Sequence, residues 1–227
     1  NRALLNWMKD IEARGLQTIN MLGCHDGLPV LDLRGKHING TVYRQGLLED
    51  HEIEATMERI ISRGGRVKNL FGADGKKIAY YQVNATYFSA LGEDEQKLRV
   101  ARAIQMFMPG IPQVWYLDLF AGSNDYEAAD NGGTAGHKEI NRTNLTMEAI
   151  EERLALPVVQ DQLALIRLRN TSPAFSGEML VIETDPHMLH ITWRHPEATA
   201  TLKADLRSHS FTVSHGHGAA EEVLMSF

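Results

Sequence analysis

The sequence has 227 residues, of which 43% are hydrophobic and 23% charged, and its net charge is −6. This composition is globular and excludes a disordered or collagen-like chain, while the acidic balance argues against nucleic-acid and anionic-membrane partners. The single cysteine, Cys24, excludes an internal disulfide, and no apolar run reaches the roughly 18 residues that span a bilayer. The start lacks a signal-peptide pattern, and we expect a reducing, cytoplasmic compartment. Because the first residue is not methionine, we also expect the chain to be part of a longer protein.

Apolar residues at helical spacing predict five helices. Glycine or proline follows three of them, where such residues end helices. Acidic residues crowd the first turn of the second helix, where the helix dipole favours them. The helices are expected at residues 4–14, 49–62, 93–108, 147–154 and 157–170.

Stretches rich in glycine or in small polar residues are predicted to be loops. The longest is 122–146, and loops of this length within a compact domain are usually functional or disordered. Shorter loops are expected at 34–47 and 66–78. Residues 80–91 fit neither the helical nor the strand period.

Short apolar runs predict strands, and the pattern changes after residue 173. Residues 18–22 and 113–117 each run into a polar segment, which is typical of a site at the carboxyl end of a barrel strand. Beyond residue 173 the period becomes two, with strands expected at 179–182 and 188–193 and further candidates at 199–205 and 211–214. We therefore predict an α/β chain: the C-terminal part of a (β/α)8 TIM barrel with long active-site loops in residues 1–173, then a small antiparallel β-domain in residues 174–227.

The pair His25-Asp26 is the sharpest candidate for chemistry. An Asp at the end of a barrel strand can stabilise a developing cation, and the neighbouring His can donate to a sugar hydroxyl; a plain turn in which the Asp bonds the backbone is equally compatible with the spacing. Lys138 and Arg142 are four residues apart, so one helical turn would place both on one side, where they could hold a phosphate or carboxylate. A solvated loop in which both pair with Glu139 explains them as well.

Other polar residues carry weaker signals. Tyr81 and Gln82 open an aromatic-rich run that also contains Asn84; its phenols and amides would line a polar pocket, or the run forms a core element with polar tips. Asp118 either reaches the same face as Asp26 or marks a strand end. The histidines in 209–217 have no acidic or cysteine ligand at a fitting spacing, so we expect no metal site.

Several strings resemble a known family. MLGCHDGLPV at 21–30 is similar to the strand-seven signature of the α-amylase family of glycosidases, which ends in His-Asp. In order, YQVNATYFSALG at 81–92, GIPQVWY at 110–116, AGSND at 121–125 and EINR at 139–142 resemble sucrose phosphorylases and their close relatives, the glucosylglycerate phosphorylases included. The resemblance covers essentially the whole chain and corresponds to the C-terminal portion of the family.

The resemblance implies a retaining double displacement. A carboxylate nucleophile forms a glucosyl-enzyme, phosphate takes the glucose, and a second carboxylate serves as acid and base. Asp26 matches the third carboxylate, the transition-state stabiliser, and the substrate-binding positions match His25, Tyr81, Gln82, Lys138 and Arg142. The nucleophile and acid/base lie upstream of His-Asp in the family, and a Gly-x-Arg-x-Asp string is absent from the sequence. We therefore expect this chain alone to be inactive.

The resemblance also implies partners. They are an α-glucoside, inorganic phosphate, the N-terminal part of the barrel and a second copy in a homodimer, with no cofactor. Ala79 stands where sucrose phosphorylases have Asp, and Lys138 where they have Arg, which argues against fructose as acceptor. We hypothesise a glucosylglycerate-type enzyme whose anionic acceptor is held by Lys138 and His137. The alternatives are a fragment of an amylase-type hydrolase and a carbohydrate-binding or scaffold module without catalysis.

Overall fold

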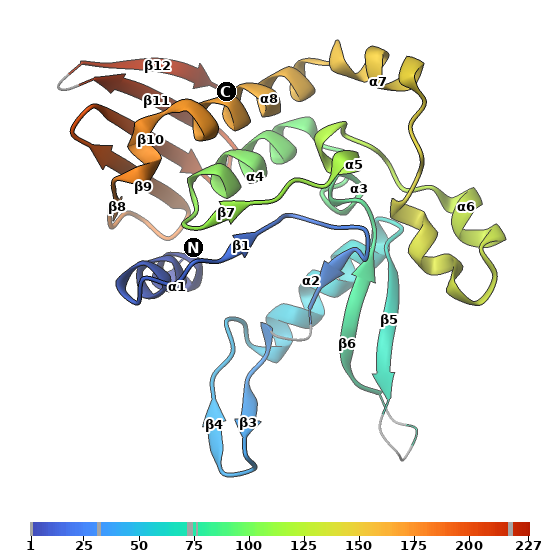
Figure 1. Cartoon of the computed structure of the whole chain (residues 1–227). Helices are drawn as coiled ribbons and strands as arrows, with labels where there is room; N and C mark the ends of the chain where they lie inside the picture. The colour runs from blue at the N-terminus through green and yellow to red at the C-terminus, as the bar shows by residue number, and fades with distance from the viewer. Residues whose placement is uncertain (1, 31–32, 72–74, 76, 218–219) are drawn as a thin grey trace. The chain divides into compact units, whose positions relative to one another are not determined.

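The structure is a computed structural model that describes residues 2–30, 33–71, 75, 77–217 and 220–227 (Figure 1). The chain divides into two compact units, each assembled from separate stretches. Unit 1 comprises Asn1–Met21, Glu95–Gln113 and Leu154–Phe227, and unit 2 comprises Leu22–Asp94 and Val114–Arg153. The domain boundary expected after residue 173 stays a prediction. No helix in the described stretches is long and apolar enough to span a membrane.

Unit 1 contains a pair of parallel strands. β1 (Ile19–Asn20) pairs with β7 (Ile111–Pro112), and helix α4 (Glu95–Phe107) immediately precedes β7, as a parallel pair requires a crossover. The buried Gln105 of α4 donates from Nε2 to the carbonyls of Asn20, at 3.1 Å, and Gln113, at 2.9 Å. This amide therefore ties the helix to both strands.

A five-stranded antiparallel sheet forms the rest of unit 1, with helices α1 (Arg2–Ala13) and α8 (Pro157–Thr171) and the short 3-10 helix η3 (Pro173–Ser176). The strand order is β12-β11-β10-β9-β8, so each strand is followed by its neighbour (Figure 1). The strands are β8 (Glu178–Val181), β9 (Met188–His195), β10 (Ala198–Asp205), β11 (Phe211–His217) and β12 (Ala220–Ser226). The first four coincide with predicted or candidate strands, and β12 was not predicted.

One arginine anchors the sheet to the end of α4. The guanidinium of Arg169 lies over the rings of Phe175, with its Cζ 4.5 Å from the centroid, and Trp193, at 5.2 Å. It donates to the carbonyl of Met106, at 3.0 Å, in the last turn of α4, where carbonyls lack intrahelical partners, and to the carbonyl of Gly110, at 2.7 Å, just beyond the helix. Burial lowers the pKa of Arg169 to about 10, so the group remains a cation at neutral pH.

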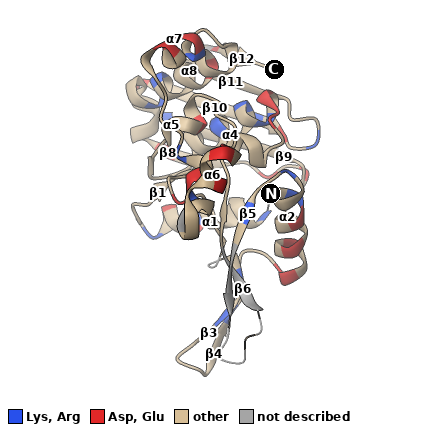
Figure 2. Cartoon of the chain, turned by 90° about the vertical axis from the view of Figure 1, so that its right-hand side faces the viewer, with Lys and Arg blue, Asp and Glu red and all other residues tan. Residues whose placement is uncertain are grey.

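Unit 2 contains a three-stranded antiparallel sheet, an isolated hairpin and short helices. Val83 of the sheet packs in a buried cluster with Val30, Ile53 and Met57, and acidic residues line the exposed side of α2 (Figure 2). The sheet strands are β2 (Leu28–Pro29), β6 (Lys77–Asn84) and β5 (Arg66–Phe71), and the hairpin is β3 (Lys36–Ile38) with β4 (Val42–Arg44). The helices are α2 (Asp50–Ser62), α3 (Tyr87–Ala90), α5 (Tyr116–Leu119), α6 (Tyr126–Asn131), η2 (a 3-10 helix, Gly133–Asn141) and α7 (Met147–Leu154).

Several local predictions were wrong, each for a physical reason. The strand expected at 113–117 is absent: the run follows the two-residue β7, and its last two residues begin α5, because short apolar runs do not distinguish strand from helix. The loops expected at 34–47 and 66–78 contain β3, β4, all of β5 and the start of β6. Residues 80–91 fit no single period because β6 ends at Asn84 and α3 begins at Tyr87, with Thr86 accepting a bond from Ser89 as its N-cap.

Candidate active site

Residues 24–27 form a tight turn that presents the side chains of His25 and Asp26. The backbone N–H of Gly27 donates to the carbonyl of Cys24 at 2.9 Å, and the N–H of Cys24 donates back to Gly27 at 3.3 Å. Gly27 has φ +90°, and a Cβ there would lie 2.1 Å from the carbonyl oxygen of Val83. Only glycine fits this position, because it tolerates positive φ and needs no space for a side chain.

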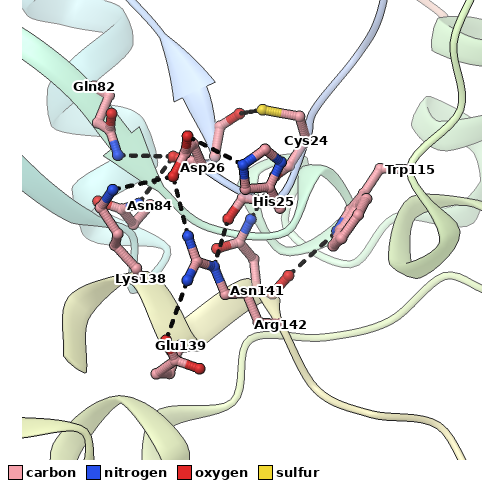
Figure 3. Close-up of polar contacts among 11 residues, drawn as sticks. Cys24, His25, Asp26, Gln82, Asn84, Trp115, Lys138, Glu139, Asn141 and Arg142 are labelled. Atoms are coloured by element: carbon pink, nitrogen blue, oxygen red, sulfur yellow. Dashed lines mark hydrogen bonds and ion pairs between the residues drawn. The ribbon is translucent and has the colours of Figure 1, made fainter. Parts of the chain in front are cut away.

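Strand β6 holds the turn through two buried amides. Gln82 Nε2 donates to the backbone carbonyl of Asp26 at 2.8 Å, and Asn84 Nδ2 donates to the same oxygen at 2.9 Å (Figure 3). Residues two apart on a strand point to the same face, so both amides reach one acceptor. Gln82 was predicted as a substrate-binding residue, and the structure places it against the backbone of Asp26.

The end of η2 holds the other side of the turn. Asn141 Nδ2 donates to the carbonyl of Cys24 at 2.7 Å, and Arg142 Nε donates to the carbonyl of His25 at 2.9 Å (Figure 3). Trp115 Nε1 donates to the backbone carbonyl of Asn141 at 3.2 Å, and the Trp115 ring lies 6.0 Å from that of His25, centroid to centroid. Each carbonyl from Cys24 to Asp26 therefore accepts a bond from a side chain.

Two cations and an imidazole surround the Asp26 carboxylate. Lys138 Nζ lies 3.1 Å and Arg142 Nη2 3.0 Å from its Oδ1, and His25 Nε2 lies 3.3 Å from Oδ2. The hydrogen bond from Lys138 lowers the pKa of Asp26; desolvation opposes it, and the charges of His25, Lys138 and Arg142 lower the pKa further. The Asp26 side chain is still 42% exposed. The result is an ionised carboxylate that remains accessible to a ligand.

The structure brings together four of the six predicted site residues around this turn, with Gln82 on its backbone. Arg142 also contacts Glu139, Nη1 to Oε1 at 3.3 Å, which is the pairing that the solvated-loop alternative expected. The side chain of Tyr81 lies outside the described residues, as does that of Ala79.

Asp118 does not lie beside the exposed carboxylate of Asp26. It is buried, and its Oδ1 accepts a bond of 2.8 Å from the backbone N–H of Tyr87 at the start of α3. Its Oδ2 lies 2.8 Å from the position that a Cβ on Gly23 would occupy, and Gly23 directly precedes the turn. Asp118 thus packs behind the turn. Within the described ranges, no three His, Cys, Asp or Glu side chains gather closely enough to hold a metal ion.

Comparison with known proteins shows what the chain is similar to. No family model matches the chain. The chain is 57% identical over 224 residues to the sucrose 6(F)-phosphate phosphorylase of Ilumatobacter coccineus, covering 99% of this chain and 42% of that protein. It is 35% identical to the protein of the same name from Thermoanaerobacterium thermosaccharolyticum, covering 98% of this chain and 43% of the relative.

A solved structure shows the same fold. The crystal structure of sucrose 6F-phosphate phosphorylase from Thermoanaerobacter thermosaccharolyticum superposes with a TM-score of 0.80 at 30% identity, covering 98% of this chain and 46% of that one. The predicted fold class, the C-terminal part of a barrel followed by an antiparallel β-domain, is thereby confirmed.

The sequence identities and the shared fold make this chain a homologue of glucoside phosphorylases. Its particular homologues are sucrose 6F-phosphate phosphorylases, sucrose phosphorylases and glucosylglycerate phosphorylases, and it matches their C-terminal portion. The chain spans about 42% of the length of the first relatives.

Asn141 and Trp115 were not recognised from the sequence as parts of the site, and Asn84 was considered only as an amide that could line a polar pocket. Asn84 and Trp115 lie inside the strings that carry the family resemblance, YQVN and GIPQVWY, and Asn141 lies inside EINR. These family strings were the feature of the sequence that could have identified the three residues.

Proposed function

We propose that the protein to which this chain contributes is a retaining glucoside phosphorylase that uses sucrose 6F-phosphate. It transfers the glucosyl group to inorganic phosphate, giving α-glucose 1-phosphate and fructose 6-phosphate. The observation that carries the proposal is the accessible, ionised Asp26 carboxylate between Lys138 and Arg142, in a chain 57% identical to a protein of that name.

Asp26 acts on the transition state. As the glycosidic bond breaks, positive charge develops on the glucose ring, and a fixed carboxylate stabilises that charge without reorganising. His25 stands 3.3 Å from Oδ2 of Asp26 and is itself exposed, so it presents a hydrogen-bonding ring to a sugar hydroxyl beside the carboxylate. Retention requires a nucleophile and an acid/base about 5 Å apart, which we assign to the portion of the enzyme outside this chain.

The cations have two tasks. Lys138 and Arg142 keep Asp26 ionised and oriented, and their remaining N–H groups are available to the oxygens of a phosphate group near Asp26. Tyr81 is proposed from the resemblance as a further acceptor contact. Gln82 contributes by holding the backbone of Asp26 at 2.8 Å.

The acceptor hypothesis changes with the comparisons. A glycerate acceptor was inferred from an anion-binding Lys138, yet fructose 6-phosphate is also an anion and satisfies the same argument. The relative named glucosylglycerate phosphorylase from Spirochaeta thermophila is 27% identical, against 57% for the first sucrose 6(F)-phosphate phosphorylase. The higher sequence identity therefore favours sucrose 6F-phosphate over glucosylglycerate as the substrate.

The test is an assay of the complete protein with inorganic phosphate and, separately, sucrose 6F-phosphate, sucrose and glucosylglycerate. We expect glucose 1-phosphate from all productive turnovers, with sucrose 6F-phosphate at least tenfold faster in kcat/KM. Faster turnover of glucosylglycerate would restore the earlier hypothesis. Free glucose as the main product would identify a hydrolase, and binding of glucosides without turnover would identify a binding module.

The same proposal includes location and assembly. We place the enzyme in the cytoplasm, where inorganic phosphate and sugar phosphates are available as substrates, and assign it a homodimer. Fractionation of cells and light scattering of the complete protein measure the two.

A further inference from the structure

Two buried asparagines donate hydrogen bonds to opposite ends of the turn that carries Asp26. Asn84, at the end of β6, donates from Nδ2 to the carbonyl of Asp26 at 2.9 Å. Asn141, the last residue of η2, donates from Nδ2 to the carbonyl of Cys24 at 2.7 Å. Their relative exposures are 0% and 1%, so neither side chain is available to a sugar.

These contacts determine where the carboxylate points. Peptide units are planar, so fixing the carbonyls before His25 and after Asp26 fixes the peptide planes on both sides of the pair. The Asp26 side chain is 42% exposed and is held through ionic contacts at its tip. Catalytic groups must stay within a fraction of an ångström of their productive position, which makes the backbone anchors consequential.

The choice of asparagine costs stability, which argues for a role beyond packing. Neither Oδ1 of Asn84 nor Oδ1 of Asn141 has a hydrogen-bond partner among the described residues, although both atoms are buried. A buried unsatisfied carbonyl is unfavourable, and an apolar side chain of similar size would avoid it. What asparagine supplies and an apolar residue lacks is the donor to the turn.

We propose that Asn84 and Asn141 are positioning residues that aim the Asp26 carboxylate at the glucosyl transition state. The inference rests on the proposed function, in which Asp26 stabilises that transition state. A residue that acts through Asp26 has nothing to act on once Asp26 is removed, so the effects of the two substitutions should not add.

The experiment is a double-mutant cycle in the complete protein. We expect N84A and N141A each to lower kcat for phosphorolysis of sucrose 6F-phosphate about 10- to 100-fold, with KM changed less than about threefold. In a D26N background, either substitution should change the residual kcat less than about twofold. Full additivity, or unchanged kcat in the single variants, would overturn the proposal.

Controls separate folding from positioning. Asn124 is a buried asparagine of the same unit whose Oδ1 accepts from the backbone N–H of Thr86, away from the turn. We expect N124A to lower the Tm but leave kcat within about twofold. If N84A does not fold, the nearly isosteric N84D, which replaces the donor with an acceptor, takes its place in the cycle and must show the same loss of kcat.

The outcomes distinguish the two proposals. If D26N leaves kcat unchanged, the proposed role of Asp26 fails and the positioning proposal fails with it. If D26N lowers kcat but the asparagine variants behave like N124A, the proposed function stands and only the positioning proposal is overturned.

Discussion

Arg142 Nη2 lies 3.0 Å from Oδ1 of Asp26, while Nε of the same guanidinium donates to the carbonyl of His25 at 2.9 Å. One planar group thus bonds both the carboxylate and the backbone of the turn. An ammonium carries the same charge but cannot reproduce this fork.

We therefore expect R142K to lower kcat/KM of the complete protein by about 10- to 100-fold, although the charge is conserved. The matched control is R153K, because Arg153 donates to the backbone carbonyls of Phe120 and Ala121 and not to the turn. Steady-state kinetics measure both. Equal kinetics for R142K and the parent protein would show that charge alone is required.

Lys138 makes the stability contributed by Asp26 dependent on pH. Its hydrogen bond holds the pKa of the carboxyl below the usual 3.8, so the ionised form is favoured in the folded protein. Stability from this ionisation is present above the unfolded-state pKa and is lost as pH falls through the lower folded-state value. We expect K138M to lower the Tm near neutral pH, and the difference from the parent protein to shrink as the pH falls below the usual carboxyl pKa of 3.8. A difference that grows on acidification would contradict this assignment.

Gly27 permits no side chain. At φ +90° and 2.1 Å from the carbonyl of Val83, a Cβ requires the backbone to move, so we expect G27A to cost at least ~2 kcal/mol of unfolding free energy and to lower kcat by displacing Asp26. Gly40 is the control, because its φ is +72° with nothing within 4 Å of a Cβ. G40A should cost about 1 kcal/mol and leave kcat unchanged. Calorimetry and kinetics of the two variants decide; equal stabilities would refute the steric argument.

Arg169 is expected to matter for stability alone. Removing its two backbone hydrogen bonds and its stacking on Phe175 and Trp193 in R169M should cost about 2–4 kcal/mol, because two carbonyls lose a donor and the cation–π contacts disappear. R167M changes an exposed residue of the same helix and should stay within ~0.5 kcal/mol of the parent protein. Urea unfolding followed by fluorescence compares them. A similar cost for both variants would mean that the stacking contributes little.

The 227-residue chain produced alone should associate with itself. Ile19 of β1 and Ile111 of β7 face each other in register and are 63% and 61% exposed. In a barrel, such positions are covered by neighbouring strands, and exposed apolar strands promote association. Light scattering should find oligomers or aggregates, reduced in the I19K/I111K variant. A monodisperse monomer of the unaltered chain would contradict the prediction.

Helix α2 shows where the sequence could predict an element, and two others show where it could not. Helix α2 has its apolar residues at helical spacing and was found to within one residue, because burial imposes the period. All six residues of β3 and β4 are exposed, so their hairpin carries no alternating pattern. The pairing of β12 with β11 shifts register between Val213 and Ser214, and this irregularity obscures the period of β12.

Some residues of the site could likewise be recognised from the sequence, and others could not. His25 and Asp26 were recognised because they are adjacent and polar after an apolar run, and Lys138 and Arg142 because both are cations one helical turn apart. The anchoring contacts of Asn84 and Asn141 were not predicted, because each side chain bonds a backbone carbonyl that lies far away in the sequence, 58 residues for Asn84 and 117 for Asn141. A contact with the main chain leaves no complementary side chain for spacing or charge to reveal.

The assembly of unit 1 from three stretches of sequence has a consequence for synthesis on the ribosome. Helix α1 and strand β1 are translated before their partners, since β1 pairs with β7, and α1 contacts β8, which lies in the last of the three stretches. All of unit 2 is translated before β8 exists. The contact between α1 and β8 can therefore form only after the whole of unit 2 has been made.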